Sequence, residues 1–390
     1  MRLIYFHTYG GNPLSGVNKK IFSQASSLFK LGIDFKFVIL RGMNYNPINE
    51  EYIEYVGQNP SNIFKIPFFK SIFRQYFARK IIKEILKNSD SSTILYLRYS
   101  LPLFILPFDL SYKRKCKIVI ECNSIELNEQ KKSGFYLLYL RELLFGECFR
   151  KHCDAIIGVT EEISQYQIER SGDPTKPYIT LGNGYDVNST PMRHLPKFQG
   201  QELHLLCVAH VSYWHGLDRL IRGLAIYQGT ISVMLHIAGE GAELSTIQKL
   251  TNELGISDRV LFHGFKTGKD LDNLFNSCHI AVGSLGIHRI GLTEASILKA
   301  RDYCARGIPY LTGCADPDFP DNFPYNFKIP GDESPVDIEK VIEFSLRVFA
   351  DPNHPRKMRA YALEHLDWSV KMKKLKNFLE MLVDEPKPIV

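Results

Sequence analysis

The sequence has no uninterrupted apolar run close to the ~18 to 20 residues that a membrane-spanning helix needs. Its first residues, MRLIYFHTYGG, lack the basic-then-apolar order and the cleavage site of a signal peptide, and they are typical of a strand. The eight cysteines are scattered, with no close CxxC pair and no zinc-ligand spacing. These absences predict a cytoplasmic protein with reduced, mostly buried thiols and no metal site.

The GxGxxG dinucleotide-binding fingerprint and its ribose-binding acid are also missing, which argues against a dehydrogenase. What the chain has is an ordinary globular composition of 390 residues, 45% of them hydrophobic and 23% charged. A chain of this length can bury two separate cores. Its charge is uneven, because residues 1–185 hold 25 Lys and Arg against 17 Asp and Glu, whereas residues 186–390 hold 23 against 25. The basicity therefore belongs to the first half.

Short apolar stretches alternate with helical patterns along the whole chain. A strand at 3–9, a helix at 17–31 and a strand at 35–40 make the first such unit. Further strands are predicted at 93–97, 116–121, 155–159 and 178–180, and, after a polar segment, at 203–209, 232–238, 260–263, 279–282 and 309–311. This pattern indicates parallel sheets covered by helices on both faces.

We therefore predict an α/β protein of two doubly wound, Rossmann-like domains that meet at a cleft. The N-terminal domain is expected to cover residues 1–187 and the C-terminal domain residues 202–366. A proline-bearing linker, 188–201, separates them. A last helical segment occupies residues 367–390.

A basic segment rich in aromatic residues lies at 65–87, where seven Lys and Arg accompany one acid, Glu84. A basic amphipathic helix of this kind can lie on an anionic membrane surface. It can equally pack one face on a core and leave its cations in water. No recognised nucleic-acid motif accompanies the segment, so we expect no nucleic-acid partner.

Three glycine-bearing loops follow predicted strands and suit a cleft that binds a phosphate and a nucleotide. The first precedes a helix, whose positive end and backbone amides favour an anion. Each loop by itself is also typical of a simple strand-ending turn. The candidate binding residues in these loops are Gly10, Gly11, Gly16, Gly239, Gly241, Gly264 and Phe265.

The stretch 291–309, GLTEASILKARDYCARGIP, combines two acids with a short helix. We expect the helix to begin near Glu294, whose charge favours a helix N-terminus, and to end at Gly307 before Pro309. Asp302 follows Glu294 after seven intervening residues. Both acids can alternatively be solvated surface charges, since Lys299 and Arg306 stand at helical spacing from Asp302.

This stretch resembles the C-terminal motif of retaining glycosyltransferases of family 4, which have the GT-B fold: an acid, seven residues, a second acid, and a small-residue run ending in Gly-x-Pro. The order of the glycine loops resembles the same family, and so do Asn183-Gly184-Tyr185-Asp186 and Asp367-Trp368 near the domain crossings. The resemblance implies that the first domain faces the acceptor, the second binds a nucleotide-diphosphate sugar, and the last helix crosses back to the first domain. Glu294 would contact sugar hydroxyls and Asp302 the ribose, while Phe265 and its neighbours would contact the base.

One departure from the family concerns the donor diphosphate. Members carry an Arg and, five positions on, a Lys, and this chain has His210 and His215 at those places. Either these histidines are protonated against the phosphates, or Lys299 or Arg289 replaces them, or the site is degenerate.

The resulting hypothesis is a cytoplasmic, peripherally membrane-associated retaining glycosyltransferase that needs no cofactor beyond its nucleotide-sugar donor. Its acceptor would be lipid-linked or a glycan in cell-surface polysaccharide or glycolipid synthesis. A nucleotide-sugar epimerase of the same fold and a catalytically silent binding or assembly subunit remain the alternatives. Preorganised donors and cations facing the departing diphosphate suit transfer chemistry.

Overall fold

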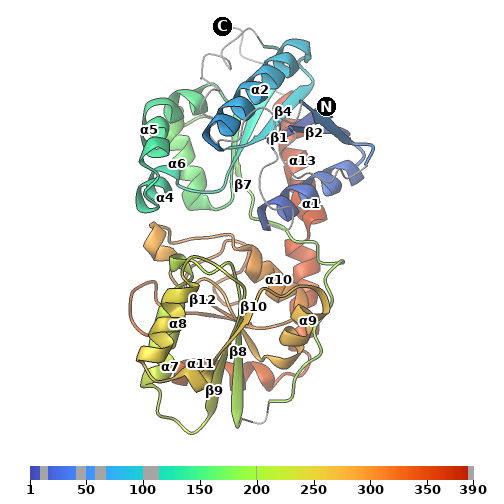
Figure 1. Cartoon of the computed structure of the whole chain (residues 1–390). Coiled ribbons are helices and arrows are strands. Elements are labelled where there is room, and N and C mark those ends of the chain that lie inside the picture. The colour runs from blue at the N-terminus through green and yellow to red at the C-terminus, as the bar shows by residue number, and fades with distance from the viewer. Residues whose placement is uncertain (9–15, 41–49, 58–66, 100–113, 199, 385–390) are drawn as a thin grey trace. The chain divides into compact units, whose positions relative to one another are not determined.

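A computed structural model describes residues 1–8, 16–40, 50–57, 67–99, 114–198 and 200–384, with side chains described outside 67–75. The chain divides into two compact units, which Figure 1 draws with their element labels. The first unit is Met1–Asn183 together with Trp368–Val390, and the second is Gly184–Asp367. The chain therefore crosses from the first unit to the second and back.

The first unit is built on a seven-stranded parallel sheet in the order β3-β2-β1-β4-β5-β6-β7. Its strands are β1 (Arg2–Thr8), β2 (Asp34–Leu40), β3 (Ile53–Val56), β4 (Thr93–Arg98), β5 (Lys117–Cys122), β6 (Ala155–Gly158) and β7 (Tyr178–Thr180). Its helices are α1 (Gly16–Lys30), α2 (Pro67–Asn88), α4 (Glu126–Lys132), α5 (Tyr136–Lys151), α6 (Glu161–Ser171) and α13 (Trp368–Asp384).

The hydrophobic core of this unit contains residues from both the N-terminal and the C-terminal parts of the sequence. Helix α1 turns Ile21, Ala25 and Leu28 inward, a spacing that places them on one helical face. Leu375 and Leu379 of α13 pack into the same core, beside strands β1 and β2. The last helix is thus part of the first unit's hydrophobic core, although almost two hundred residues of the second unit precede it in sequence.

Helix α2 contains most of the basic segment predicted at 65–87. From Tyr76 onward it buries Ala78, Ile82 and Leu86, at i, i+4 and i+8, and it contacts β2. This part of the segment is therefore a core-packing helix with an outward basic face, as in the second of the two interpretations. Lys65 and the side chains of residues 67–75 lie outside the described part.

Buried ion pairs connect α4, α5 and α6. The guanidinium of Arg150 is fully buried and donates to Glu142 at 2.7 Å, to Glu126 at 2.9 Å and to the hydroxyl of Tyr99 at 3.0 Å. Burial raises the pKa of Glu126 to about 7, against the opposing charge of Arg150. Gly146 leaves the space in which Glu142 and Arg150 meet, because a Cβ there would lie 2.2 Å from the Glu142 carboxylate.

The second unit carries a six-stranded parallel sheet in the order β10-β9-β8-β11-β12-β13. Its strands are β8 (Glu202–Val208), β9 (Ser232–Ala238), β10 (Val260–Gly264), β11 (Ile280–Val282), β12 (Tyr310–Thr312) and β13 (Asn326–Lys328). Its α-helices are α7 (Leu217–Ile226), α8 (Leu244–Glu253), α9 (Gly268–Ser277), α10 (Leu298–Arg306), α11 (Ile338–Phe349) and α12 (His354–Tyr361). The short 3₁₀ helices η2 (Tyr213–His215), η3 (Ser257–Arg259) and η4 (Ile287–Ile290) and the π-helix η5 (Ala362–Leu366) complete it.

Both faces of this second sheet are buried. Leu203, Leu205 and Cys207 of β8 point into one core, while Leu206 points into the other with Tyr303 of α10. Alternate residues of a strand face opposite sides of a sheet, so the almost continuous apolar run of β8 follows from double coverage.

Residues 188–201, predicted as a linker, belong to the second unit. Arg193 is buried there and donates to the carbonyl oxygens of Cys278 at 2.6 Å and Gly307 at 3.1 Å. Just before this segment, Tyr185 forms an isolated parallel β-bridge with Asp367, so the two places where the chain passes between the units are paired. These polar anchors explain why a proline-bearing segment is held in place.

The predicted α/β class and all eleven predicted strands are confirmed within one or two residues. The short strands β3 and β13 escaped prediction. Each of the eight cysteines, all of which lie in the described ranges, has a free thiol, and seven are buried. Among the described helices, none is long and apolar enough to cross a membrane.

Replacing Arg150 with methionine should lower the free energy of unfolding by about 3 to 5 kcal/mol, because Glu142 and Glu126 would lose the fully buried cation that they share, and only the partly exposed Arg170 would remain beside Glu142. Urea denaturation measures this change. The adjacent, exposed Lys151→Met is the matched control and should change stability by less than about 0.5 kcal/mol. Equal stability of the two variants would show that the buried ion pairs are dispensable.

Candidate donor-binding site

Five parallel strands of the second unit end at the same edge of the sheet, as the pairing of β8 with β9 and β11, of β9 with β10, and of β11 with β12 requires. The loops that leave this edge begin at Ala209, Gly239, Phe265, Gly283 and Gly313. Crevices at the carboxyl ends of strands are where open α/β sheets bind ligands. Most of the predicted site residues of this unit lie in these loops or in α10.

The loop after β9 packs backbone to backbone on the loop after β8. A Cβ at Gly239 would lie 1.8 Å from the oxygen of Ala209, and one at Gly241 would lie 2.2 Å from the oxygen of Val211. Both glycines also have positive φ values, 142° and 149°. The amide of Val211 donates to the carbonyl of Glu240 at 2.6 Å. The need for glycine at 239 and 241 is therefore explained by loop packing alone.

His215 lies in the short turn η2 and is buried. Its Nδ1 accepts a hydrogen bond from the amide of Ser212 at 3.0 Å, so the proton of the neutral ring is on Nε2. Burial, with the charge of Lys299, lowers the pKa of His215 to about 2. Without ligand, His215 is therefore a neutral hydrogen-bond donor. The alternative in which a protonated His215 faces the phosphates does not hold for the free chain. His210, five residues earlier, is exposed.

Lys299, in the first turn of α10, has its ammonium nitrogen buried with no hydrogen-bond partner among the described residues. Burial lowers its pKa. Its charge acts on His215, so the structure brings together two of the groups proposed for the diphosphate. A buried ammonium without an acceptor is costly unless an anion or another polar group satisfies it.

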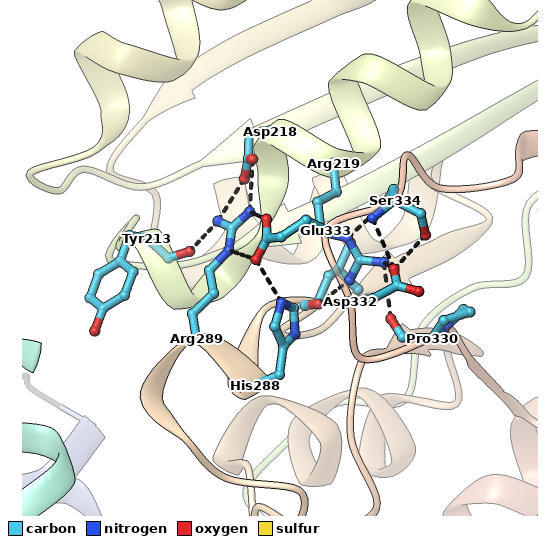
Figure 2. A network of polar contacts seen from close by, with 10 residues as sticks. Tyr213, Asp218, Arg219, His288, Arg289, Pro330, Asp332, Glu333 and Ser334 are labelled. Carbon is cyan, nitrogen blue, oxygen red and sulfur yellow. Dashed lines mark hydrogen bonds and ion pairs between the residues drawn. The ribbon is translucent and has the colours of Figure 1, made fainter.

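Arg289, the other alternative cation, is already paired. Figure 2 shows its guanidinium between the carboxylates of Asp218 and Glu333, at 2.8 and 2.5 Å, with the carbonyl of Tyr213 accepting at 2.7 Å. These hydrogen bonds raise the pKa of Arg289 and lower the pKa of Glu333 to about 2. Arg289 therefore acts as a clamp on the turn that carries His215.

A second arginine in Figure 2 supports the same turn. Arg219 donates to the carbonyl of Leu285 at 2.6 Å and to that of Pro330 at 2.9 Å. The amide of Leu285 in turn donates to the carbonyl of His215 at 3.0 Å. The loops after β8, β11 and β13 are thus connected by arginine side chains, which the sequence motifs did not reveal.

Helix α10 begins at Leu298, and the prediction that it begins near Glu294 is wrong. Residues around Glu294 are extended instead, because the amide of Ala295 donates to Ala315 at 2.9 Å and the amide of Ala315 donates to Thr293 at 3.1 Å. Glu294 therefore precedes the helix, and the first-turn dipole argument does not apply to it. The predicted end at Gly307 is confirmed, with φ of 76°.

The start of α10 is fixed by a buried arginine. Arg301 has no exposed surface and pairs with Asp316 and Asp318 in the segment that follows β12. One Nη of Arg301 also donates to the carbonyl of Ile297 at 3.1 Å. This ion pair holds the segment of Glu294 against the segment of Ala315.

Asp302 lies on α10 with two hydrogen-bond donors. Arg306 donates to Asp302 at 2.8 Å, four residues away on the same helix. The hydroxyl of Tyr185 donates to the same oxygen at 2.6 Å. Asp302 is therefore not a solvated surface charge, and its Oδ1 is already engaged without ligand. No local pattern in the sequence predicts the Tyr185 contact, since the two residues are 117 positions apart.

The remaining predicted residues lie at loop ends. Gly264 ends β10 with φ of 65°, and Phe265 after it is 59% exposed. Gly16 is the first residue of α1. Gly10 and Gly11 lie outside the described residues.

On the first unit, Glu121 of strand β5 is buried. Lys20 donates to it at 2.6 Å and Gln24 at 2.8 Å, and Tyr96 also donates. Against the effect of burial, the charges of Lys20 and Arg98 lower the pKa of Glu121. The residue is a buried anchor between α1 and β5.

Comparison with solved structures identifies the fold. Sucrose-phosphate synthase (tll1590) from Thermosynechococcus elongatus superposes with a TM-score of 0.70 at 15% identity, over 98% of this chain and 99% of that one. WaaG, a glycosyltransferase involved in lipopolysaccharide biosynthesis, gives 0.66 at 13% identity, over 98% and 100%. Anabaena Alr3699/HepE in complex with UDP-glucose gives 0.62 at 13% identity, also over 98% and 100%. The fold is GT-B, that of many glycosyltransferases.

Residues 192–310 match the family model of glycosyl transferases group 1. Two curated proteins share a shorter stretch: the uncharacterized glycosyltransferase YqgM of Bacillus subtilis, 33% identical over 85 residues, and the uncharacterized glycosyltransferase MJ1607 of Methanocaldococcus jannaschii, 31% identical over 84 residues. Each match covers 22% of this chain, and 24% and 22% of those proteins. The matched family region contains the loops after β8, β9 and β10 and helix α10.

Replacing Gly241 with alanine should lower the free energy of unfolding by about 2 to 4 kcal/mol, because the new methyl group would overlap the backbone of Val211. Chemical denaturation measures the change. Gly255→Ala is the matched control: Gly255 also has a positive φ, 67°, but a Cβ there meets nothing within 4 Å. That variant should lose only about 1 kcal/mol. If both variants lose the same amount, the loop packing is not the reason for glycine at 241.

Proposed function

We propose that this protein is a retaining glycosyltransferase that transfers a sugar from a nucleotide-diphosphate sugar to a lipid-linked or glycan acceptor in cell-surface polysaccharide or glycolipid synthesis. The match of residues 192–310 to glycosyl transferases group 1 supports transfer chemistry. The likeness to WaaG and to the UDP-glucose complex of HepE supports a nucleotide-sugar donor and a polysaccharide-type product. No cofactor beyond the donor is proposed.

The observation that carries the proposal is the arrangement at the carboxyl edge of the second sheet. A buried lysine ammonium without a described partner and a neutral histidine donor lie together after β8 and at the start of α10. A departing diphosphate needs cations and hydrogen-bond donors that are already in position when negative charge develops. Lys299 supplies the cation and His215 a neutral Nε2–H donor, while His210 stays a peripheral candidate.

The two acids are proposed to hold the rest of the donor. Glu294, in the extended segment before α10, would contact sugar hydroxyls, and Asp302 would contact the ribose through the oxygen that Tyr185 and Arg306 leave available. Gly264 and the exposed ring of Phe265 would border the base. Gly239 and Gly241 contribute by holding the loop of His210 and His215 in place.

Lys299→Met should weaken the binding of the nucleoside diphosphate by about tenfold or more, because a hydrogen bond between charged groups contributes about 1.5 to 3 kcal/mol. Calorimetry with the nucleoside diphosphate, and with the nucleoside alone, separates the diphosphate contact from the base contact. Affinity for the nucleoside should not change. Lys249→Met, on an exposed lysine of α8, is the matched control and should bind both ligands as the parent does.

The same calorimetry, repeated at several pH values, tests the charge of His215. Because His215 is neutral above about pH 2 in the free chain, its protonation should not make affinity fall between pH 6.5 and 8. Burial also lowers the pKa of Lys299, so the same pH series is measured in Lys299→Met. An affinity that falls over this range in both proteins, by more than the ligand's own titration requires, would restore the histidines as cations. Unchanged diphosphate affinity in Lys299→Met would remove Lys299 from the role.

The proposed reaction is tested by transfer itself. After a panel of nucleotide sugars has been screened for thermal stabilisation, the anomeric configuration of the product is read by NMR and should match that of the donor. Glu294→Gln should reduce turnover strongly with little change in the melting temperature, because Glu294 is half-buried and belongs to neither hydrophobic core of its unit. Interconversion of donor sugars without transfer would indicate an epimerase, and an unchanged rate in Glu294→Gln would exclude its proposed contact.

A further inference from the structure

Helix α5 buries charged residues and exposes apolar ones, which is the reverse of an ordinary surface helix. The face toward the protein carries Glu142, Gly146, Phe149 and Arg150, all buried. The face toward solvent carries large apolar side chains, each between 48% and 68% exposed: Tyr136, Leu137, Leu140, Leu143 and Leu144. Surface helices of globular proteins normally bury the apolar stripe and expose the polar one.

The exposed residues form one continuous stripe. Positions 136, 140, 143 and 144 follow the i, i+4, i+7, i+8 spacing of a single helical face, and 137 lies beside them. Phe135, immediately before the helix, is 59% exposed and extends the stripe at its N-terminal end. Figure 1 shows α5 at the outer side of the first unit, over α6. We call these six side chains the α5 face.

The fold prevents α5 from turning this face inward. Arg150 pairs on the inner side with Glu142 of its own helix and Glu126 of α4, and also bonds Gln167 of α6. Rotation of the helix would leave these charges buried without partners, which costs several kcal/mol for each broken pair. The exposure of the α5 face is therefore a fixed property of the first unit.

The charges around the α5 face are mainly positive. Exposed Lys131 and Lys132 precede it at the end of α4, half-buried Arg141 lies beside it, and exposed Lys151 ends the helix. Two exposed acids, Glu129 and Glu147, oppose these four cations. An apolar stripe with aromatic side chains next to lysines fits the boundary between acyl chains and headgroups.

We propose that the α5 face docks this protein on an anionic lipid bilayer. Anionic headgroups would neutralise the cations around the stripe while the leucines enter the acyl boundary. A two-fold pairing of two copies through this face would instead bring two net positive surfaces together. The inference rests on the proposed function only in that a lipid-linked acceptor would be found at such a surface. It moves the expected membrane contact from the segment 65–87 to α5.

The test is flotation of the 390-residue protein with vesicles of phosphatidylcholine, with and without phosphatidylglycerol. We expect binding to the phosphatidylglycerol vesicles that weakens with added salt, since exposed charges are screened over about 10 Å at 0.1 M. The double variant Leu140→Gln/Leu144→Gln should reduce partitioning by about tenfold or more. Its matched control, Ile226→Gln/Leu346→Gln, removes two equally exposed apolar residues of the second unit and should bind as the parent does.

Three results would overturn the proposal. They are no vesicle binding by the parent, equal binding by the α5 variant and the parent, and loss of binding only in Lys80→Gln/Lys87→Gln, which would return the contact to α2. Light scattering on the same samples tests the other possible partner, a second copy of this chain. A dimer of the parent that dissociates in the α5 variant would show that the α5 face is a contact between copies. Donor binding, followed on the same preparations, tests the proposed function separately, because intact vesicle binding without donor binding would contradict only that function.

Discussion

The loops at the carboxyl edge of the second sheet depend on backbone-to-backbone packing that only glycine permits. Gly239 and Gly241 bring the loop after β9 against Ala209 and Val211 of the loop after β8, at distances where a Cβ has no room. The turn of His215 follows directly, and the loop after β11 supports it through Leu285. The candidate site is therefore made of short loops held by one another.

Charge pairing then decides which groups remain available to a ligand. Arg289 is held by Asp218 and Glu333, so a permanent cation close to the site serves the architecture of the loops. The ammonium of Lys299 has no acceptor among the described residues, and burial, together with the charge of Lys299, lowers the pKa of His215 and keeps it neutral. Under the proposed function, a neutral histidine and a lysine would together supply the donor set that a diphosphate requires, with the cation on helix α10 and not in the loop.

In the first unit, buried ion pairs also fix the orientation of an element, but there they leave apolar side chains exposed at the surface. The ion pairs of Arg150 occupy the inner side of α5, and four of the five leucines of that helix are exposed. A pattern-based prediction of a membrane contact selected residues 65–87, since cations and aromatic residues alternate there. Ala78, Ile82 and Leu86 of that segment instead pack inward. Sequence periodicity finds an amphipathic helix, but it does not say which face the protein uses.

The sequence by itself determined the two parallel-sheet units, all their strands except β3 and β13, the glycine stop of α10 and the loops that hold the candidate residues. Strand period, helix period and glycine stops are local properties of the chain. Only the tertiary structure decided where α10 begins, which acids are already bonded and that the ammonium of Lys299 has no acceptor within the described ranges. Asp302 meets Tyr185 across 117 positions, and His204, His236 and His263 from three strands form a chain of hydrogen bonds at 2.8 and 2.9 Å. Such contacts arise when strands distant in sequence become neighbours in a sheet, and no local pattern encodes them.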